Sequence, residues 1–224
     1  MSRPIKLLIL IILSLSVYFI YQNTKQSNIK ILSLGDSLSL GINSYGIKDY
    51  SYIDDYKDHL ENKNIKVSVI DKYSTKDLTI HELLELIKNN NNLKRDLSEA
   101  HILFLTVGYN DLQYKISLEE NINIKRINMI IDDISKEYKE LLKEIKKYYR
   151  NKIIVIGYPK TNKEDFYHNI GIRKLNKTLN NNIYINTYSI LNNRKKYFSN
   201  PNSYYPNRQG YIRIYNEIIR NIDY

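Results

Sequence analysis

Residues 29–41 read IKILSLGDSLSLG, and the rest of the chain can be understood from this stretch. An apolar, β-prone run ends abruptly at Gly35-Asp36-Ser37, and a second glycine, Gly41, follows in the same loop. In open α/β sheets ligands bind outside the carboxyl ends of the strands, where this serine would lie. A glycine before it lets the backbone turn sharply and approach a ligand closely. Gly, Asp and Ser are also ordinary turn residues, so the tripeptide marks a candidate site that needs further context.

The rest of the chain alternates β-prone runs with amphipathic helical patterns. Four more strands are expected at 65–70, 101–107, 153–157 and 183–185. Helices are expected at 50–62, from residue 80 to a polar turn at 89–92, at 117–149 as one bent helix or two helices, at 170–179 and at 210–222. Strands that alternate with helices predict a three-layer α/β/α sandwich around a mostly parallel, five-stranded sheet.

The composition limits the classes of function. The chain has 224 residues and a net charge of +10, with acidic residues interleaved among the basic ones. No dense basic tract with aromatic spacing occurs, so nucleic acid is not an expected partner. The absence of cysteine from the sequence excludes disulfides and thiolate metal sites. The sequence also contains no metal-ligand motif or phosphate-binding glycine loop, and we expect neither a cofactor nor a metal.

The amino terminus has the pattern of a membrane anchor. Arg3 and Lys6 precede an apolar run at 7–21, and a helix over residues 5–21 would be about 25 Å long, close to the ~30 Å hydrocarbon core. Residues 22–25 offer no small-residue cleavage site, which favours an uncleaved anchor over a cleaved signal peptide. We therefore divide the chain into an anchor with a short linker (1–27) and a domain (28–224). The basic residues before the run place that domain on the extracytoplasmic side of a bacterial cell membrane, which the chain crosses once.

Two further sequence blocks follow expected elements in the same way. Gly108-Tyr109-Asn110-Asp111 comes after the third strand, and Tyr205-Pro206-Asn207-Arg208-Gln209-Gly210-Tyr211 opens the last helix. With Gly35-Asp36-Ser37-Leu38, these blocks resemble the signature of the SGNH/GDSL hydrolase family: GDSL, GxND and a terminal DxxHPN followed by a Gly-Tyr pair. The resemblance extends from about residue 29 to the carboxyl end. It implies a flavodoxin-like fold and the activity of a GDSL-type lipase, acylhydrolase or esterase, in which an acyl group passes to serine and then to water.

The resemblance assigns roles to individual residues. Ser37 corresponds to the nucleophile, and its own N–H would help bind the oxyanion. Asn110 corresponds to the side-chain oxyanion donor, and Gly108 belongs to the loop that presents it. The family's third donor is a glycine N–H, and in this chain Lys76 stands in the equivalent loop, so its backbone N–H is the expected donor. One such donor is typically worth ~10²–10³ in rate.

The last block departs from the family pattern at both catalytic positions. Tyr205 stands at the position of the histidine, and Asn202 at that of the aspartate. A serine is a weak nucleophile without a base to take its proton. A phenol, with an ordinary pKa near 10, accepts protons poorly at neutral pH, and an amide cannot stabilise a positively charged partner as a carboxylate does. Catalysis is therefore expected to be impaired or altered.

One histidine is a candidate for the missing base. His168 is expected in a loop over residues 161–169, after the fourth strand and on the same rim as Ser37. His59 and His81 fall on helical patterns, and His101 begins the third strand, at the far end of a parallel sheet. A base must lie within hydrogen-bond reach of the proton it removes. His168 is thus the alternative base, or else a residue of a lid or of the surface.

Three hypotheses remain open from the sequence. The first is a membrane-anchored ester hydrolase that acts on acyl or acetyl groups of envelope glycans or lipids. The second is a pseudoenzyme that binds cell-wall carbohydrate or a membrane protein partner. The third is a structural envelope protein that keeps the motifs only as loop architecture. Ser37, Gly108 and Asn110 favour the first hypothesis, whereas Asn202 and Tyr205 favour the second.

Overall fold

The computed structural model describes residues 12–16, 28–160, 166–180, 183–200 and 203–222. Its centre is a five-stranded sheet in the order β2-β1-β3-β4-β5, and every pair of neighbouring strands is parallel. The strands are β1 (Asn28–Gly35), β2 (Lys66–Ile70), β3 (Ile102–Thr106), β4 (Ile153–Ile156) and β5 (Ile183–Ile185). The prediction of a mostly parallel five-stranded sheet is confirmed.

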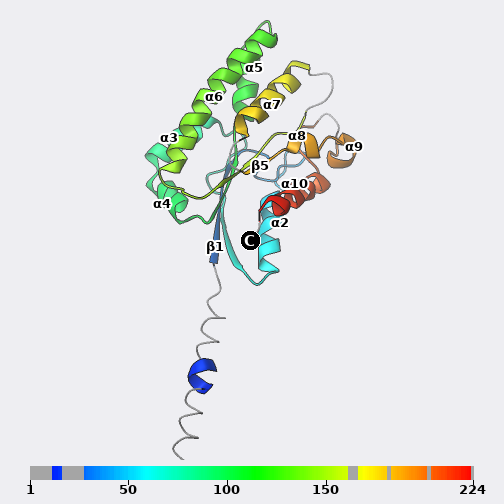
Figure 1. Cartoon of the computed structure of the whole chain (residues 1–224). Coiled ribbons are helices and arrows are strands. Elements are labelled where there is room, and N and C mark those ends of the chain that lie inside the picture. Colours follow the sequence, from blue (N-terminus) through cyan, green and yellow to red (C-terminus); the bar gives the residue numbers. More distant parts are fainter. Residues whose placement is uncertain (1–11, 17–27, 161–165, 181–182, 201–202, 223–224) are drawn as a thin grey trace, which may run out of the picture.

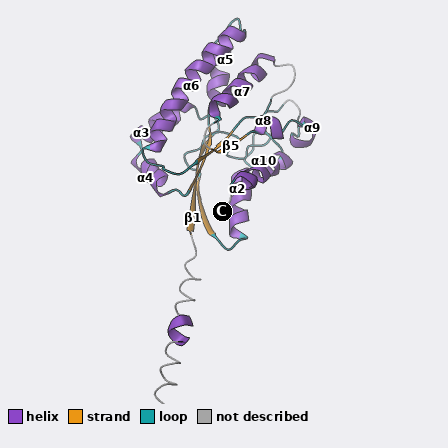
Figure 2. Ribbon diagram, viewed as in Figure 1, coloured by secondary structure: helices purple, strands orange, loops and turns teal. Residues whose placement is uncertain are grey.

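Helices cover both faces of this sheet (Figures 1 and 2). One side carries α3 (Ile80–Asn89), α4 (Asn91–Glu99), α5 (Tyr109–Ser117), α6 (Ile124–Lys146) and α7 (Phe166–Leu179). The other side carries α2 (Tyr52–Glu61) and α10 (Arg208–Asn221), with the short helices α8 (Thr187–Ile190) and α9 (Arg194–Tyr197) next to α10. The three layers match the predicted sandwich.

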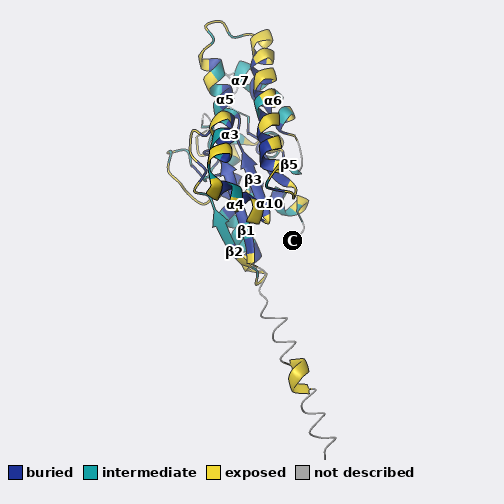
Figure 3. Cartoon of the chain, turned by 90° about the vertical axis from the view of Figure 1, so that its left-hand side faces the viewer, coloured by how far each residue is buried: buried dark blue, intermediate teal, exposed yellow. Residues whose placement is uncertain are grey.

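The core lies between the central strands and the two helical layers (Figure 3). All five residues of β3 are buried, as expected for a strand covered on both faces. In β1, Leu32 pairs with Ile70 of β2 on one side and with Leu103 of β3 on the other. The carboxyl ends of these strands consequently lie together at one edge of the sheet, where Gly35 pairs with Thr106.

Two helical regions differ from the sequence-based prediction. The polar turn expected at 89–92 is a single junction residue, Asn90, whose side chain accepts a hydrogen bond from Leu93 N–H and begins α4. The region expected at 117–149 to be a bent helix or two helices holds one continuous helix, α6, which Asn123 caps. A separate helix, α5, begins directly after Gly108 and ends at Ser117, where no helix was expected before residue 117. Local caps, rather than the apolar repeat, set these boundaries.

Most of the expected membrane anchor lies outside the described residues. Within it, residues 12–16 are helical and exposed. In the part of the chain that the structure describes, no helix has both the length and the apolar composition needed to cross a membrane.

Candidate active site

The loop after β1 holds Ser37 at the carboxyl edge of the sheet. Asp36 N–H donates to the carbonyl of Thr106 at 2.9 Å, so the chain turns next to the end of β3. A Cβ atom on Gly35 would lie 2.6 Å from Ser39 Oγ and 3.0 Å from Thr106 O, and this crowding requires glycine. Ser37 is 6% exposed. Its side chain is therefore held at the rim with a small accessible surface.

The loop after β3 brings a second polar pair to the same edge. Gly108 has φ 120°, a conformation that favours glycine, and α5 begins at the next residue. In the first turn of α5, Asn110 Nδ2 donates to Leu78 O at 3.0 Å and to Lys76 O at 3.2 Å. Both carboxylate oxygens of Asp111 accept from Ile80 N–H at 3.1 Å. The start of α5 is thus tied to the segment that leads into α3.

Ser37 and Asn110 meet at one oxygen atom. Ser37 Oγ donates to the carbonyl of Lys76 at 2.7 Å, and this is the oxygen to which Asn110 Nδ2 also donates. The structure therefore brings the expected nucleophile and the expected oxyanion donor together, although they are 73 residues apart in the sequence. Lys76 lies between them, but it presents its carbonyl rather than the N–H that the sequence led us to expect.

Hydrogen bonds at both ends fix the turn that contains Lys76. Thr75 N–H donates to Gly35 O at 3.2 Å, and Leu78 N–H donates to Thr75 O at 3.3 Å. The Lys76 ammonium group donates to Gly46 O at 2.7 Å, so this side chain points along the rim toward the 43–48 loop. The segment 75–78 is thereby attached to Gly35, just before Ser37, and to Gly46 in the 43–48 loop.

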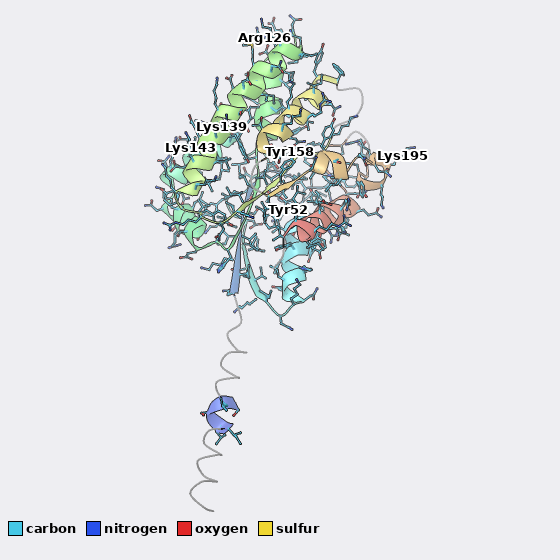
Figure 4. The ribbon with its side chains drawn as sticks, in the orientation of Figure 1. Tyr52, Arg126, Lys139, Lys143, Tyr158 and Lys195 are labelled. Atoms are coloured by element: carbon cyan, nitrogen blue, oxygen red, sulfur yellow. The ribbon has the colours of Figure 1, made fainter. Side chains whose placement is uncertain are left out.

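A buried carboxylate supports the Ser37 loop from inside. Asp36 is 1% exposed; Oδ1 accepts from Leu38 N–H at 3.0 Å, and Oδ2 accepts from the Tyr158 hydroxyl at 2.6 Å. Burial raises the pKa of Asp36 to about 7, although both hydrogen bonds oppose the shift. Burial and the neighbouring Asp36 raise the pKa of Tyr158 as well. Figure 4 shows Tyr158 in the interior, close to the sheet.

Sequence reasoning missed Tyr158 as part of the site. It lies two residues beyond the end of β4, where an aromatic residue before Pro159 gives no sign of a carboxylate partner 122 residues away. Its ring lies 5.4 Å from that of Tyr109, and Tyr109 stacks on Tyr204 at 3.9 Å between centroids. Burial also raises the pKa of Tyr204. Tyr109 and Tyr204 thus pack around the Tyr158 ring, whose hydroxyl donates to Asp36.

The part of the last block that agrees with the family signature, Pro206 to Tyr211, has structural roles. Asn207 caps α10 by accepting from Gly210 N–H at 3.0 Å, and its own N–H donates to Tyr197 O at 2.8 Å. The Tyr211 hydroxyl donates to Ile42 O at 2.8 Å, in the loop that follows Ser37. These contacts hold the start of α10 against the rim of the site.

Tyr205 lies at this rim without a hydrogen bond to Ser37. Its main-chain N–H donates to the Ser203 hydroxyl at 3.0 Å, and its carbonyl accepts from Ser44 Oγ at 3.3 Å. Its ring meets Tyr204 edge-on at 5.7 Å. Within the described residues, the hydrogen bond of the Ser37 hydroxyl goes to Lys76. Asn202, at the expected aspartate position, lies outside the described residues.

His168 lies on a helix and not, as expected, in a loop. It belongs to the first turn of α7, and its Nε2 lies 3.1 Å from Gln113 Oε1 on α5. Gln113 is three residues beyond Asn110 on α5, so this contact joins the first turn of α7 to α5. Among the other histidines, His59 lies 3.2 Å from the Tyr215 hydroxyl, and His101 Nδ1 accepts from Lys30 N–H. In the described residues no group of three or more His, Cys, Asp or Glu could hold a metal ion.

A serine hydroxyl and an asparagine amide thus meet at the carboxyl edge of a parallel sheet, as expected from the resemblance to the SGNH/GDSL hydrolases. Residues 31–218 match the family model described as GDSL-like Lipase/Acylhydrolase, and the chain belongs to this family. A comparison with curated proteins gives no significant match.

Solved structures of the same class share the fold. A lipase from a goat rumen metagenome superimposes with a TM-score of 0.73 at 20% identity, over 86% of this chain and 97% of that chain. A catalytic mutant of an acetylxylan esterase from Geobacillus stearothermophilus gives a TM-score of 0.65 at 14% identity, over 88% and 95%. A member of the lipolytic protein G-D-S-L family from Veillonella parvula gives 0.61 at 16%, over 86% and 97%.

Proposed function

We propose that this protein is a membrane-anchored, extracytoplasmic ester hydrolase that acts on acyl or acetyl groups of envelope glycans or lipids, with impaired or altered catalysis. The observation that carries the proposal is the oxygen shared by Ser37 and Asn110. Two donors that converge on one carbonyl oxygen support the proposal that an ester carbonyl is recognised at this point of the rim. Family membership supplies the reaction class.

In the proposed reaction Ser37 Oγ attacks the carbonyl carbon of the ester. A new C–O bond forms, the hydroxyl proton passes to a base, and the carbonyl oxygen becomes an oxyanion that the Asn110 amide stabilises. Collapse of the tetrahedral intermediate expels the alcohol, which takes up a proton. Water then attacks the acyl-serine, releases the carboxylic acid and restores the Ser37 hydroxyl.

The weak point of this reaction is the first proton transfer. Ser37 donates to a main-chain carbonyl, which is not basic enough to accept the proton. The family's histidine position holds Tyr205, and His168 lies against Gln113. These features support slow hydrolysis, or hydrolysis that depends on high pH, rather than the rate of a complete triad.

A polar hollow beside the site suits a glycan alcohol. It measures about 530 Å³ and begins at Ser44, which bonds to the Tyr205 carbonyl. Its other walls include Asn43, Tyr45 and Lys195. Amide and hydroxyl groups around an exposed aromatic ring, here Tyr45 at 81% exposure, can hydrogen-bond and stack against a sugar. The esterase of acetylated xylan among the similar structures points to the same substrate class.

One observation favours a second candidate function, a pseudoenzyme that binds carbohydrate or a membrane protein partner. The hydroxyl of Ser37 is satisfied by Lys76 O and points toward no base among the described residues. Such a protein would use the hollow at Ser44 and Tyr45 without turnover.

A fluorophosphonate probe on the purified full chain separates the two candidates. Ser37 Oγ bonds to phosphorus and fluoride leaves, so labelling reports an activated serine. We expect labelling and slow hydrolysis of a short-chain aryl ester, both abolished in Ser37→Ala. Glycan binding with no labelling would instead establish the pseudoenzyme.

Substitution then identifies the base. Loss of hydrolysis in Tyr205→Phe is expected if Tyr205 accepts the Ser37 proton, and loss in His168→Gln is expected if His168 does. The variant at the other position should keep the wild-type rate.

Anchoring is tested separately in cells. The full chain should remain in the membrane fraction after a high-salt wash, and external protease should digest it in spheroplasts. Release by salt, or protection from the protease, would contradict the proposed location while leaving the ester-hydrolase activity to be judged on its own.

A further inference from the structure

The turn at residues 75–78 directs a carbonyl oxygen at the point where the oxyanion would form. Lys76 O lies 2.7 Å from Ser37 Oγ and 3.2 Å from Asn110 Nδ2. A carbonyl oxygen carries partial negative charge, so it would repel an oxyanion placed beside Asn110. An oxyanion hole needs donors at that point, already aimed at the developing charge. In this conformation the turn opposes ester chemistry.

The backbone of the turn identifies its type. Leu78 N–H donates to Thr75 O, which makes Lys76 and Asp77 the two central residues of a β-turn. Within the described residues Asn64 is the only non-glycine residue with positive φ, so Asp77 has negative φ. A hydrogen-bonded turn with negative φ at both central residues is type I. Type II keeps the same end-to-end hydrogen bond but reverses the central peptide and requires positive φ at the second central residue.

We propose that the main-chain N–H of Asp77 is an oxyanion donor of this site, brought to Ser37 and Asn110 when the Lys76–Asp77 peptide rotates from the type I to the type II arrangement. The inference rests on the proposed ester-hydrolase function, and it assigns the donor to Asp77 instead of Lys76. The reason is geometric, because one peptide unit carries both groups. The unit that now points its oxygen at the site would then point its N–H there.

The surroundings of the turn permit this rotation without moving its ends. Thr75 N–H is held by Gly35 O and Leu78 N–H by Thr75 O, and both turn types keep these bonds. The Asn110 amide has two hydrogens. One stays on Leu78 O, and the rotation frees the other from Lys76 O to face the substrate.

Residue 77 itself suits the change. Aspartate and asparagine adopt the left-handed conformation more readily than other non-glycine residues. No hydrogen bond to a described residue engages the Asp77 N–H, so none has to break.

Substitutions at residue 77 test the rotation through the rate at which the fluorophosphonate probe labels Ser37 in the full chain. Glycine takes positive φ without steric cost, so Asp77→Gly should raise the rate about tenfold. A β-branched residue strongly resists positive φ, so Asp77→Val should lower the rate by about tenfold or more. Asp77→Ala should fall between the two, which separates backbone freedom from loss of the carboxylate.

Asn64→Gly is the matched control. Asn64 has positive φ, at 60°, and it lies between α2 and β2, at the opposite edge of the sheet from Ser37. Glycine there relaxes a backbone position without touching the site, and the labelling rate should stay unchanged.

A crystal structure of the Ser37 adduct gives the direct result. We expect the phosphonyl oxygen to accept from Asp77 N–H and from Asn110, with positive φ at Asp77. Labelling that requires Ser37 but is the same for all residue-77 variants, or an adduct with Lys76 O still facing Asn110, would overturn this inference alone. Failure of the wild type and of every variant to label would overturn the ester-hydrolase function, and this inference with it.

Discussion

The two sides of the candidate site are built to different degrees. On one side, the loops after β1 and β3 and the turn at 75–78 are joined by hydrogen bonds that all converge on Ser37 and Asn110. On the other side, the segment 203–207 is held by its main chain and by the cap of α10, and it offers Ser37 no hydrogen bond. The difference teaches that the proposed nucleophile and the proposed oxyanion donor can be held together while no proton acceptor is held beside them.

The largest expected effect comes from restoring the family's residue types on the side of the site that carries the segment 203–207. Asn202→Asp combined with Tyr205→His restores the residue types of the family at both positions, and a positioned base typically contributes ~10²–10⁴ in rate. Hydrolysis of a short-chain aryl ester by the full chain should rise by about that factor. Asn202→Asp with Tyr205→Phe is the control, since it keeps a ring but no base. A double variant that folds yet stays at background would show that the two sides do not face each other.

Removing the amide of Asn110, on the side of the site that carries Ser37, should change the rate by a slightly smaller factor. In the rebuilt variant, Asn110→Ala should lower kcat by ~10²–10³ with little change in KM, because the amide acts on the transition state. Asn110→Asp matches the shape without the donor and should lose as much. An effect confined to KM would mean that Asn110 serves only to hold Lys76 and Leu78 in place.

Asp36, the buried carboxylate in the Ser37 loop, makes the free energy of unfolding depend on pH. Asp36 keeps its proton up to about pH 7 in the folded state, against an ordinary pKa of 3.8. Its contribution to the free energy of unfolding is therefore complete below about pH 4 and is lost as the pH rises through 7. At ~1.4 kcal/mol per pKa unit the loss is at most about 4 kcal/mol.

Asp36→Asn checks this dependence. The amide oxygen can accept from Leu38 N–H and the amide nitrogen can donate to the Tyr158 oxygen, as a protonated carboxyl would. Denaturant unfolding at several pH values should show the wild type losing stability relative to the variant between pH 4 and 7. Parallel curves would mean that Asp36 is ionised throughout this range.

The smallest effect concerns the hydroxyl of Tyr158. Tyr158→Phe leaves Asp36 Oδ2 without its donor in a buried position, which should cost about 1–3 kcal/mol of unfolding free energy at pH 8. Tyr138→Phe is the matched control, because its hydroxyl is buried and has no partner among the described residues. That change should be neutral or stabilising, and equal losses in both variants would remove the special role of the Tyr158–Asp36 bond.

The sequence specified the sheet well because its signals are local. Apolar runs mark β1 and β3; Gly35 ends β1, and Gly108 follows two residues after the end of β3. It failed at α4, where the segment Asn91–Glu99 is mostly polar and only Leu93, Asp96 and Leu97 are buried. It also failed at His168, whose helix carries a weak apolar pattern.

In the candidate site, sequence patterns identified residues but not orientations. The motifs predicted that Ser37, Gly108 and Asn110 lie at one edge of the sheet, and the side chains of Ser37 and Asn110 donate to the same carbonyl oxygen there. The direction of the Lys76 carbonyl depends on the rotation of a single peptide plane, which no residue pattern encodes. The Asp36–Tyr158 bond joins residues that are far apart in the chain. They meet because β1 and β4 both pair with β3, which lies between them.

The segment that carries Tyr205 is held by Arg194, whose guanidinium group donates to the carbonyls of Lys160 and Ser203 and stacks on Phe198. Because this clamp and the cap at Asn207 hold mainly backbone atoms, the Tyr205 side chain contributes little to the architecture. Natural selection can then exchange this side chain with small risk to folding. Two codon changes, at positions 202 and 205, would add or remove a proton acceptor. Catalytic activity can therefore change in this segment during evolution while the fold is kept.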